Sequence, residues 1–328
     1  NMDIKGNGAR MFLRNAKVDG NLNMINGGGF LDVGNVHVTK DASLKTLNAS
    51  QNIDKNCTDY VKHFTHIIGE TKVDGNLKVD SVNNVHIGGY DYDAKKLADG
   101  KLTVGGNLDV HATDGHITTT IDTSANKISY KSDNYNILTD GKATLSAKEY
   151  EFSANGYIGG LNPTKNYTVD DVIVSVMENY KQINDSSKPA NVNIAGGTIT
   201  KINTPTNAYI ASKGDVKLTG ANAKNVNITA PGKYIEITGP DVHADNIIVG
   251  KETDKLKVDF PSRDYTLKYT NIRDAKEVTV GKTEEITYEL TNGENGYNTR
   301  DPRPENTTYL VGPDKPNPDP KPDPKPDP

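Results

Sequence analysis

The chain has 328 residues, of which 34% are hydrophobic and 6% aromatic, and it contains no tryptophan. A chain of this length with so few apolar residues cannot fill a thick globular core, so the composition favours a thin core in an elongated molecule. Lysine and arginine number 38 against 43 aspartates and glutamates, a net charge of -5. That balance provides no basic patch for neutralising phosphates, and we expect no nucleic-acid partner.

Redox and targeting features set few limits. The single cysteine, Cys57, excludes an intramolecular disulfide framework and does not fix the compartment. No apolar stretch approaches the roughly 20 residues that span a bilayer, and no charged-then-apolar signal segment opens the chain. Because the sequence begins abruptly at Asn1-Met2-Asp3 and ends within a repeat, we expect it to be a piece of a longer protein.

A self-similar phrase recurs in the first third of the chain. It reads as a turn carrying Gly and Asn followed by a strand with alternating apolar positions. Its copies are Lys17-Val18-Asp19-Gly20-Asn21-Leu22-Asn23-Met24, Lys72-Val73-Asp74-Gly75-Asn76-Leu77-Lys78-Val79 and Thr103-Val104-Gly105-Gly106-Asn107-Leu108-Asp109-Val110.

Short alternating segments continue in the second half, at spacings of about ten residues. They are Asp215-Val216-Lys217-Leu218, Asn225-Val226-Asn227-Ile228, Tyr234-Ile235-Glu236-Ile237 and Asn246-Ile247-Ile248-Val249. A strand this short cannot bury its apolar face in one hairpin, whereas stacking coil upon coil does bury it. We therefore predict an all-β, right-handed parallel β-helix over residues 1–259. With about 20 residues per coil and ~4.8 Å between coils, some thirteen coils would form a rod roughly 60 to 70 Å long.

Two segments break this pattern. Residues 168–183 carry apolar side chains at helical spacing, and Thr168 and Asp171 are spaced as an N-cap and its N3 acid, which predicts an amphipathic helix on the rod's flank or end. A second apolar stripe near 57–68, including Tyr60, Phe64 and Ile67, predicts a short helix-like insertion and equally fits an irregular strand.

The last part of the chain changes in texture. From about Phe260 glycine becomes scarce and alternating segments appear, which predicts a small β region over 260–299 that caps the solenoid with a few antiparallel strands. Residues 300–328 are rich in proline, and from Pro313 onward proline alternates with Asp, Lys or Asn. We expect this segment to be an extended, semi-rigid spacer.

The repeats resemble those of a known family. Gly-Asn-Leu followed by an alternating strand, Asn-Val-His-Val at 35–38, Asn-Val-Asn-Ile at 191–194 and 225–228, and Ala-Thr-Leu-Ser-Ala at 143–147 resemble the degenerate repeats of filamentous haemagglutinin-like adhesins. These are exoproteins of two-partner secretion systems in Gram-negative bacteria. The resemblance covers roughly residues 15–250. It implies export through an outer-membrane transporter, a right-handed β-helix and service as an adhesin or toxin-delivery stalk. The family's N-terminal secretion domain is not found here, so an autotransporter passenger stays an alternative route.

Parallel β-helices also include polysaccharide lyases and hydrolases. Lyases of this kind use an Arg or Lys base beside acids that hold calcium, and hydrolases use a pair of carboxylates. Between residues 15 and 250 the chain has no arginine, and nowhere is there a tryptophan to stack on a sugar. We therefore predict no enzymatic activity, no catalytic residue and no cofactor, with a carbohydrate-active β-helix enzyme as the alternative.

Several local motifs contain residue types found in functional sites, but we expect them to be turn, packing or surface residues. Asp91 and Asp93 flank Tyr92 as in a calcium loop but lack its repeating nonapeptide, and Cys57, His63 and His66 lack a fourth ligand for zinc, so we predict no metal. Further candidates follow the same assignment: Asp114-Gly115-His116 as turn residues, Tyr90 and Tyr92 as packing residues, and the sequons at Asn48, Asn56, Asn166, Asn184, Asn227 and Asn306 as unmodified.

The functional hypothesis is an extracellular segment on a bacterial cell surface, acting as an adhesin or stalk and folding as a monomeric rod. Its expected partners are a host or bacterial surface receptor, including a glycan, and the transporter of its secretion system. The third hypothesis is the stalk of a contact-dependent toxin. It would require a catalytic domain in sequence beyond Pro328.

Overall fold

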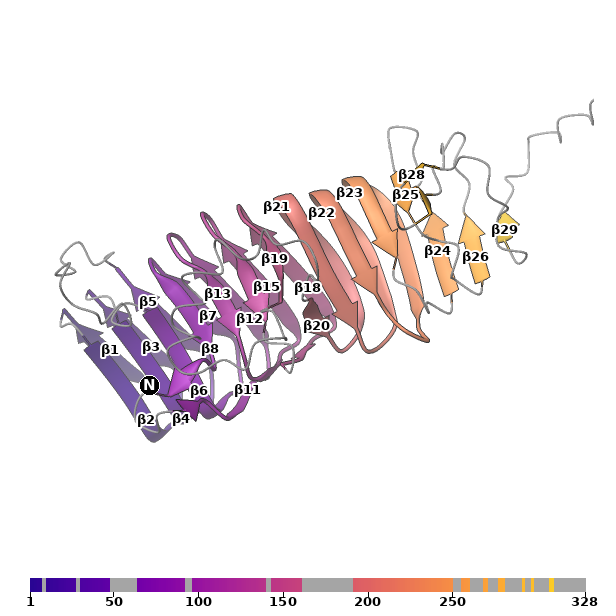
Figure 1. The fold of residues 1–328 in the computed structure, drawn as a ribbon. Helices are drawn as coiled ribbons and strands as arrows, with labels where there is room; N and C mark the ends of the chain where they lie inside the picture. Colours follow the sequence, from indigo (N-terminus) through magenta and orange to yellow (C-terminus); the bar gives the residue numbers. More distant parts are fainter. Residues whose placement is uncertain are drawn as a thin grey trace, which may run out of the picture.

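The computed structural model describes residues 1–7, 10–27, 30–47, 64–91, 96–139, 143–160 and 191–249, and six strands after them. Within these residues the protein is all β, with strands and turns but no helix. Almost all strand pairs are parallel, and together they form an elongated stack that runs from the N-terminus toward the later strands (Figure 1). This pairing is that of a β-solenoid, as the sequence predicted.

Face A of the solenoid is a stack of thirteen described strands, each paired in parallel with the next. In order they are β1 (Met2–Gly6), β3 (Leu22–Asn26), β5 (Ala42–Thr46), β7 (Leu77–Ser81), β12 (Asn107–Ala112), β15 (Lys127–Ser132), β18 (Glu149–Ala154), the first parts of β21 (Gly197–Ser212), β22 (Val216–Thr229) and β23 (Tyr234–Val249), then β24 (Lys255–Asp259), β26 (Glu277–Val280) and β29 (Thr307–Tyr309). Eleven of these described strands fall within residues 1–259, for which the sequence predicted some thirteen coils.

Two further faces close each coil. Face B contains the first halves of β2 (Arg10–Val18), β4 (Phe30–Val38) and β6 (Phe64–Val73), then β8 (Asn84–Ile87), β13 (Ile117–Thr119), β16 (Ile137–Thr139) and β19 (Ile158–Gly160). Face C contains the second halves of β2, β4 and β6, then β11 (Gly100–Val104), β14 (Asp122–Ser124), β17 (Leu145–Ser146) and β20 (Val192–Ile194). β21, β22 and β23 are long strands whose first part lies on face A and whose last part continues the pairing of faces B and C.

The long strands of the first coils bend from face B to face C at one stacked position. Asn15 and Asn35 have φ values of 53° and 54°, and Gly69 has a φ of 63°. Asparagine and glycine are the residues that tolerate this left-handed region. The Asn35 amide donates to Asn15 Oδ1 at 3.1 Å, and its own oxygen accepts from the Glu70 N–H at 3.0 Å. The corner is therefore stabilised from coil to coil by side-chain amides.

A second side-chain ladder follows the turn between faces C and A. Asn1 Oδ1 accepts from the Asn21 N–H at 3.0 Å, and Asn21 Oδ1 accepts from the Asp41 N–H at 3.2 Å. Asp41 Oδ1 accepts from the Asn76 N–H at 2.7 Å, and Asn76 Oδ1 accepts from the Asn107 N–H at 2.9 Å. Each oxygen satisfies a turn N–H that has no strand partner. The Gly-Asn phrase recurs because its Asn supplies this acceptor.

The core lies between the three faces and is built from stacked aliphatic rows such as Leu22, Ala42, Leu77, Leu108 and Ile128. Burying each Leu or Ile side chain contributes about 1.5–3 kcal/mol. Farther along the stack the core holds aromatic rings, with the Tyr130 and Phe152 centroids 6.2 Å apart. The thin core explains how a chain with few apolar residues folds.

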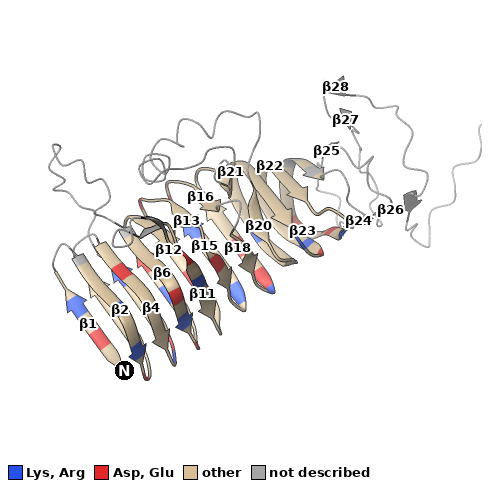
Figure 2. Ribbon diagram, turned by 60° about the horizontal axis from the view of Figure 1, so that its bottom comes forward, with Lys and Arg blue, Asp and Glu red and all other residues tan. Residues whose placement is uncertain are grey.

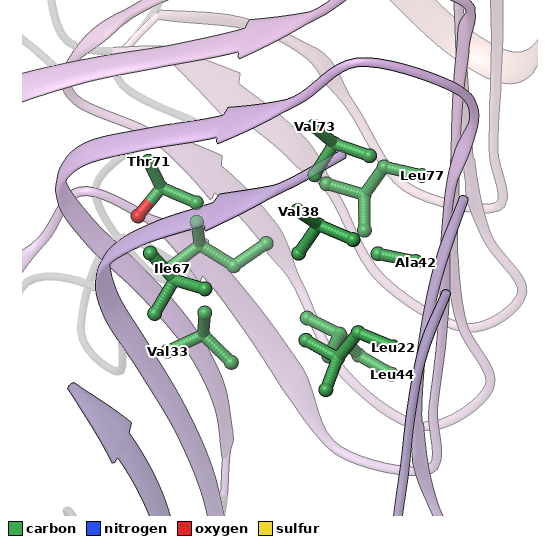
Figure 3. A pocket seen from close by; sticks show the side chains of 10 residues that line it. Leu22, Val33, Val38, Ala42, Leu44, Ile67, Thr71, Val73 and Leu77 are labelled. Carbon is green, nitrogen blue, oxygen red and sulfur yellow. The ribbon is translucent and has the colours of Figure 1, made fainter. Parts of the chain in front are cut away.

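A small cavity of about 10 Å³ lies inside the first coils (Figure 3). It is lined by apolar side chains from the three faces and by Thr71, whose hydroxyl donates to the Ile68 carbonyl at 2.9 Å. A space of this size holds one water at most, and an apolar lining keeps such a space dry. It is a packing defect rather than a ligand site.

The stripe near 57–68 left open a helix-like insertion or an irregular strand, and where it is described it is a strand. Residues 64–68 of the stripe near 57–68 form the first half of strand β6. Ile67 faces the core, while His66 and Ile68 are buried on the opposite side, so this part of the strand is buried on both faces and does not alternate between apolar and polar residues. The rest of that stripe, 57–63, and the predicted helix at 168–183 lie outside the described residues.

Near the C-terminus the described strands mostly extend the parallel stack. β26 pairs in parallel with β24, and β25 (Lys268–Thr270) pairs in parallel with β23. β27 (Thr291–Asn292) and β28 (Gly296–Tyr297) form an antiparallel pair. β29 lies inside the range predicted as spacer, 300–328, and pairs with β26, so a strand occupies part of that range. Residues 310–328 lie outside the described part.

Candidate functional site

Buried polar side chains gather on the outer side of face B. Asp32, His66, His86, Thr118 and Leu138 are register partners on β4, β6, β8, β13 and β16, and we call them the outer strip. Their neighbours along each strand point into the core, so the strip points away from it.

Three residues of the outer strip are almost inaccessible to solvent, although they point away from the core. Asp32 and Thr118 are each 1% exposed, and Leu138 is 0% exposed. Two other buried apolar residues, Phe30 and Ile68, also face this side. This side of the solenoid is thus packed rather than solvated.

Asp32 is the centre of the strip's charge network. Its carboxylate accepts from Arg14 Nε at 2.5 Å and from Arg14 Nη2 at 2.8 Å, which is a bidentate pair. Burial alone would raise the pKa of Asp32, but the hydrogen bonds and charges of His66 and Arg14 outweigh burial and hold this pKa below its usual value. The carboxylate is therefore ionised and fully engaged.

His66 bridges Asp32 to the next coil. Its Nδ1 lies 2.9 Å from Asp32 Oδ2, and its Nε2 lies 2.5 Å from the Gly88 carbonyl. Both neighbours are acceptors, so both contacts are hydrogen bonds only when each ring nitrogen carries a hydrogen. The network Arg14–Asp32–His66–Gly88 thereby connects β2, β4, β6 and the end of β8.

His86 continues the strip beside His66. Burial, followed by the charges of His66 and His116, lowers the pKa of His86 well below its ordinary value. The residue as a whole is half-buried, and its ring is neutral at pH 7. Thr118, its partner on β13, has a buried hydroxyl with no hydrogen-bond partner among the described residues.

A third ladder lies at the turn between faces A and B, next to the strip. Asn84 Oδ1 accepts from the His116 N–H at 2.7 Å, and Asn136 Oδ1 accepts from the Tyr157 N–H at 2.7 Å. Between them, His116 Nδ1 accepts from the Asn136 N–H at 3.4 Å. Burial lowers the pKa of His116 to about 4. We call Asn84, His116, Asn136 and Tyr157 the imidazole ladder.

The residues weighed as sites from sequence do not converge in the described part of the chain. His66 is engaged with Asp32 and Gly88, whereas Cys57 and His63 lie outside the described residues. Asp91 ends β9 (Tyr90–Asp91), which pairs with β10 (Lys96–Leu97), while Tyr92 and Asp93 are not described. Among described residues no group of three or more His, Cys, Asp or Glu side chains could hold a metal ion.

Two other motifs take structural places. The Asp114-Gly115-His116 turn connects β12 to β13, as a turn assignment predicts, although His116 also has its place in the imidazole ladder. Asn227 is the one sequon asparagine in the described residues, and it lies within β22, where its amide contacts the Ala208 carbonyl at 3.5 Å. Nothing in these contacts distinguishes it as a modified residue.

The exposed faces carry both signs of charge, interspersed over the strands (Figure 2). Lys127 Nζ lies 2.9 Å from Glu149 and 2.7 Å from Glu151, and His111 Nε2 lies 2.7 Å from Asp133. These part-buried pairs lie at the surface, where an ion pair contributes little to stability. They leave no field of a single sign along the described surface to attract a strongly charged ligand.

The chemistry open to the outer strip is limited by its own contacts. Asp32 accepts from Arg14 and contacts His66, and both nitrogens of His66 lie against acceptors, so these polar atoms are held by contacts within the protein. The arrangement fits a structural clasp between coils. Sequence reasoning missed Arg14 and Asp32 because each occurs once at its place in a degenerate repeat; the register partner of Arg14 is Gly34, two residues beyond Asp32, so no shared repeat position marks the pair.

Comparisons with known proteins give no relative: no protein-family model matches the chain, and no curated protein or solved structure matches it. No helix in the described residues is long and apolar enough to cross a membrane.

Proposed function

We propose that this chain is a non-enzymatic stalk or adhesive segment of an extracellular bacterial surface protein, built as a right-handed parallel β-helix. The observation that carries the proposal is the stack of thirteen registered strands on face A, which makes a long molecule from a thin core. A right-handed path is supported by the strong general preference for right-handed parallel crossovers.

The surface supports binding or spacing better than catalysis. The charged groups described above are paired with one another, and the buried ones are engaged in the outer strip. Together with the repeat phrases that resemble filamentous haemagglutinin-like adhesins, these features support a surface protein exported through an outer-membrane transporter, with a cell-surface receptor or glycan as its partner. A segment of this kind would hold a binding tip away from the cell.

The proposal is tested by adhesion and turnover measured on the same purified chain. Beads coated with the chain should adhere to host cells or to bacteria more than beads coated with acid-unfolded chain, and small-angle scattering should report a rod. Release of reducing or unsaturated sugar ends from a polysaccharide panel would instead establish the carbohydrate-active alternative. A compact particle in scattering would refute both. Adhesion that requires a following catalytic domain would identify the toxin-stalk alternative.

A further inference from the structure

We propose that His116 makes the middle of the rod acid-sensitive, because protonating its ring breaks the imidazole ladder that connects the coils of β8, β13, β16 and β19. The inference concerns a conformational property and does not depend on the proposed function.

In the imidazole ladder, His116 occupies a position that an asparagine occupies in the coils on either side. Asn84 and Asn136 use amide oxygens to accept a turn N–H from the next coil, at 2.7 Å in both cases. His116 stands in the same place but must use Nδ1, which lies 3.4 Å from the Asn136 nitrogen. This role requires the neutral ring with its hydrogen on Nε2.

Protonation removes that acceptor. A second hydrogen on the His116 ring would sit at Nδ1 and face the Asn136 N–H, so two donors would oppose each other in a site where His116 is only 8% exposed. Unsatisfied buried donors are costly, and the new charge would be poorly solvated. The ring would have to leave the ladder, taking with it the only side-chain acceptor between Asn84 and Asn136 in that row.

The groups around His116 do little to offset the charge. The Tyr135 ring packs against it with centroids 4.9 Å apart. His86 on β8 is another imidazole, and its pKa is lowered in part by the charge of His116. Asp114, in the same turn, is exposed and contacts the Asn134 amide at 3.5 Å. Burial is the cause that lowers the pKa of His116, to about 4.

The difference between the folded and unfolded pKa of His116 sets the direction in which stability changes with pH. The unfolded chain binds a proton at His116 near pH 6.5, whereas the folded chain does so only near pH 4, so stability is complete above about 6.5 and falls as the pH drops toward 4. Between pH 7.5 and 5, His116 alone should raise the unfolding equilibrium constant about 25-fold.

The experiment compares three chains by urea unfolding at pH 7.5 and pH 5. His116→Asn places the ladder's usual residue at the odd position and should remove this 25-fold contribution, while unfolding like the wild type at pH 7.5. His111→Asn is the matched control, because His111 contacts Asp80 and Asp133 on the outer side of face A; it should keep the wild-type acid loss from His116.

Two further readouts make the test independent of how well the variant folds. In the wild type, the Asn136 amide should lose protection from hydrogen exchange between pH 7.5 and 5, and the His116 ring should titrate near pH 4 by NMR. An unchanged acid loss in His116→Asn, or a His116 ring that titrates near 6.5 in the folded chain, would overturn the proposal.

Discussion

Replacing Asp32 with alanine would remove the carboxylate that holds both Arg14 and His66 on the outer strip. The distances involved are 2.5 and 2.8 Å to the guanidinium and 2.9 Å to the imidazole. Asp32 is 1% exposed, and the His66 side chain is equally buried. Removing one partner from a buried charge network leaves the other groups without their counter-charge and lowers the free energy of unfolding by about 3–5 kcal/mol.

The measurement is urea unfolding followed by circular dichroism at pH 7, with Asp74→Ala as the matched control. Asp74 also contacts a histidine and a basic residue, His37 at 2.9 Å and Lys72 at 2.7 Å, but on an exposed surface, so its loss should leave the midpoint nearly unchanged. Hydrogen exchange should place the weakening at β4 and β6. Equal midpoint shifts for the two variants would refute the reasoning.

The pH dependence of stability provides a second test of the role of Asp32. Because the folded-state pKa of Asp32 lies below its unfolded value of about 3.9, its stabilisation is present above pH 4 and disappears as the pH falls through the lower folded pKa. The difference in stability between wild type and Asp32→Ala should therefore shrink as the pH falls below about 4. A difference that persists in strong acid would mean that packing, not charge, is what alanine removes.

Three smaller perturbations test other parts of the rod by the same unfolding assay. Asn76→Ala removes the acceptor for the Asn107 N–H and the amide that donates to Asp41, and should cost about 1 kcal/mol; an unchanged midpoint would deny the ladder its role. Gly100→Ala should be severely destabilising, since φ is +133° and a Cβ would clash with the Gly69 carbonyl group; a folded variant of wild-type midpoint would contradict the pairing of β11 with β6. Val73→Ile adds one methylene beside the small cavity and should stabilise the fold by up to about 0.8 kcal/mol. A lower midpoint would show that the added methylene does not fit the cavity.

The sequence predicted the solenoid because its signals repeat. Gly20-Asn21, Gly75-Asn76 and Gly106-Asn107 mark the same turn, and the residue after each begins a face A strand or its first buried position. Those signals are local, so a single chain displays them. The period of about 20 residues holds from Leu22 to Ala42, but longer coils such as Ala42 to Leu77 leave fewer described coils within residues 1–259 than the sequence predicted.

The outer strip could not be predicted in the same way. Arg14, Asp32 and His66 meet only because intervening residues complete whole coils, and the lengths of those coils differ. A pattern search with a fixed period would not align them. The stripe around Ile67 and Ile68 misled for a related reason, since a strand buried on both sides has no alternation to separate it from a helix.

Register on face A survives large changes in the number of residues between partners. Leu22 and Ala42 are 20 positions apart, while Tyr150 and Ile199 are 49 apart, and both are paired neighbours. The ladders at the turns explain this tolerance, because each coil takes its alignment from the coil beneath it and not from the length of chain that leads to it. The stack should therefore tolerate insertions between strands. A foreign peptide inserted between β19 and β20, which are already far apart in the sequence, should leave the strands on either side undisturbed.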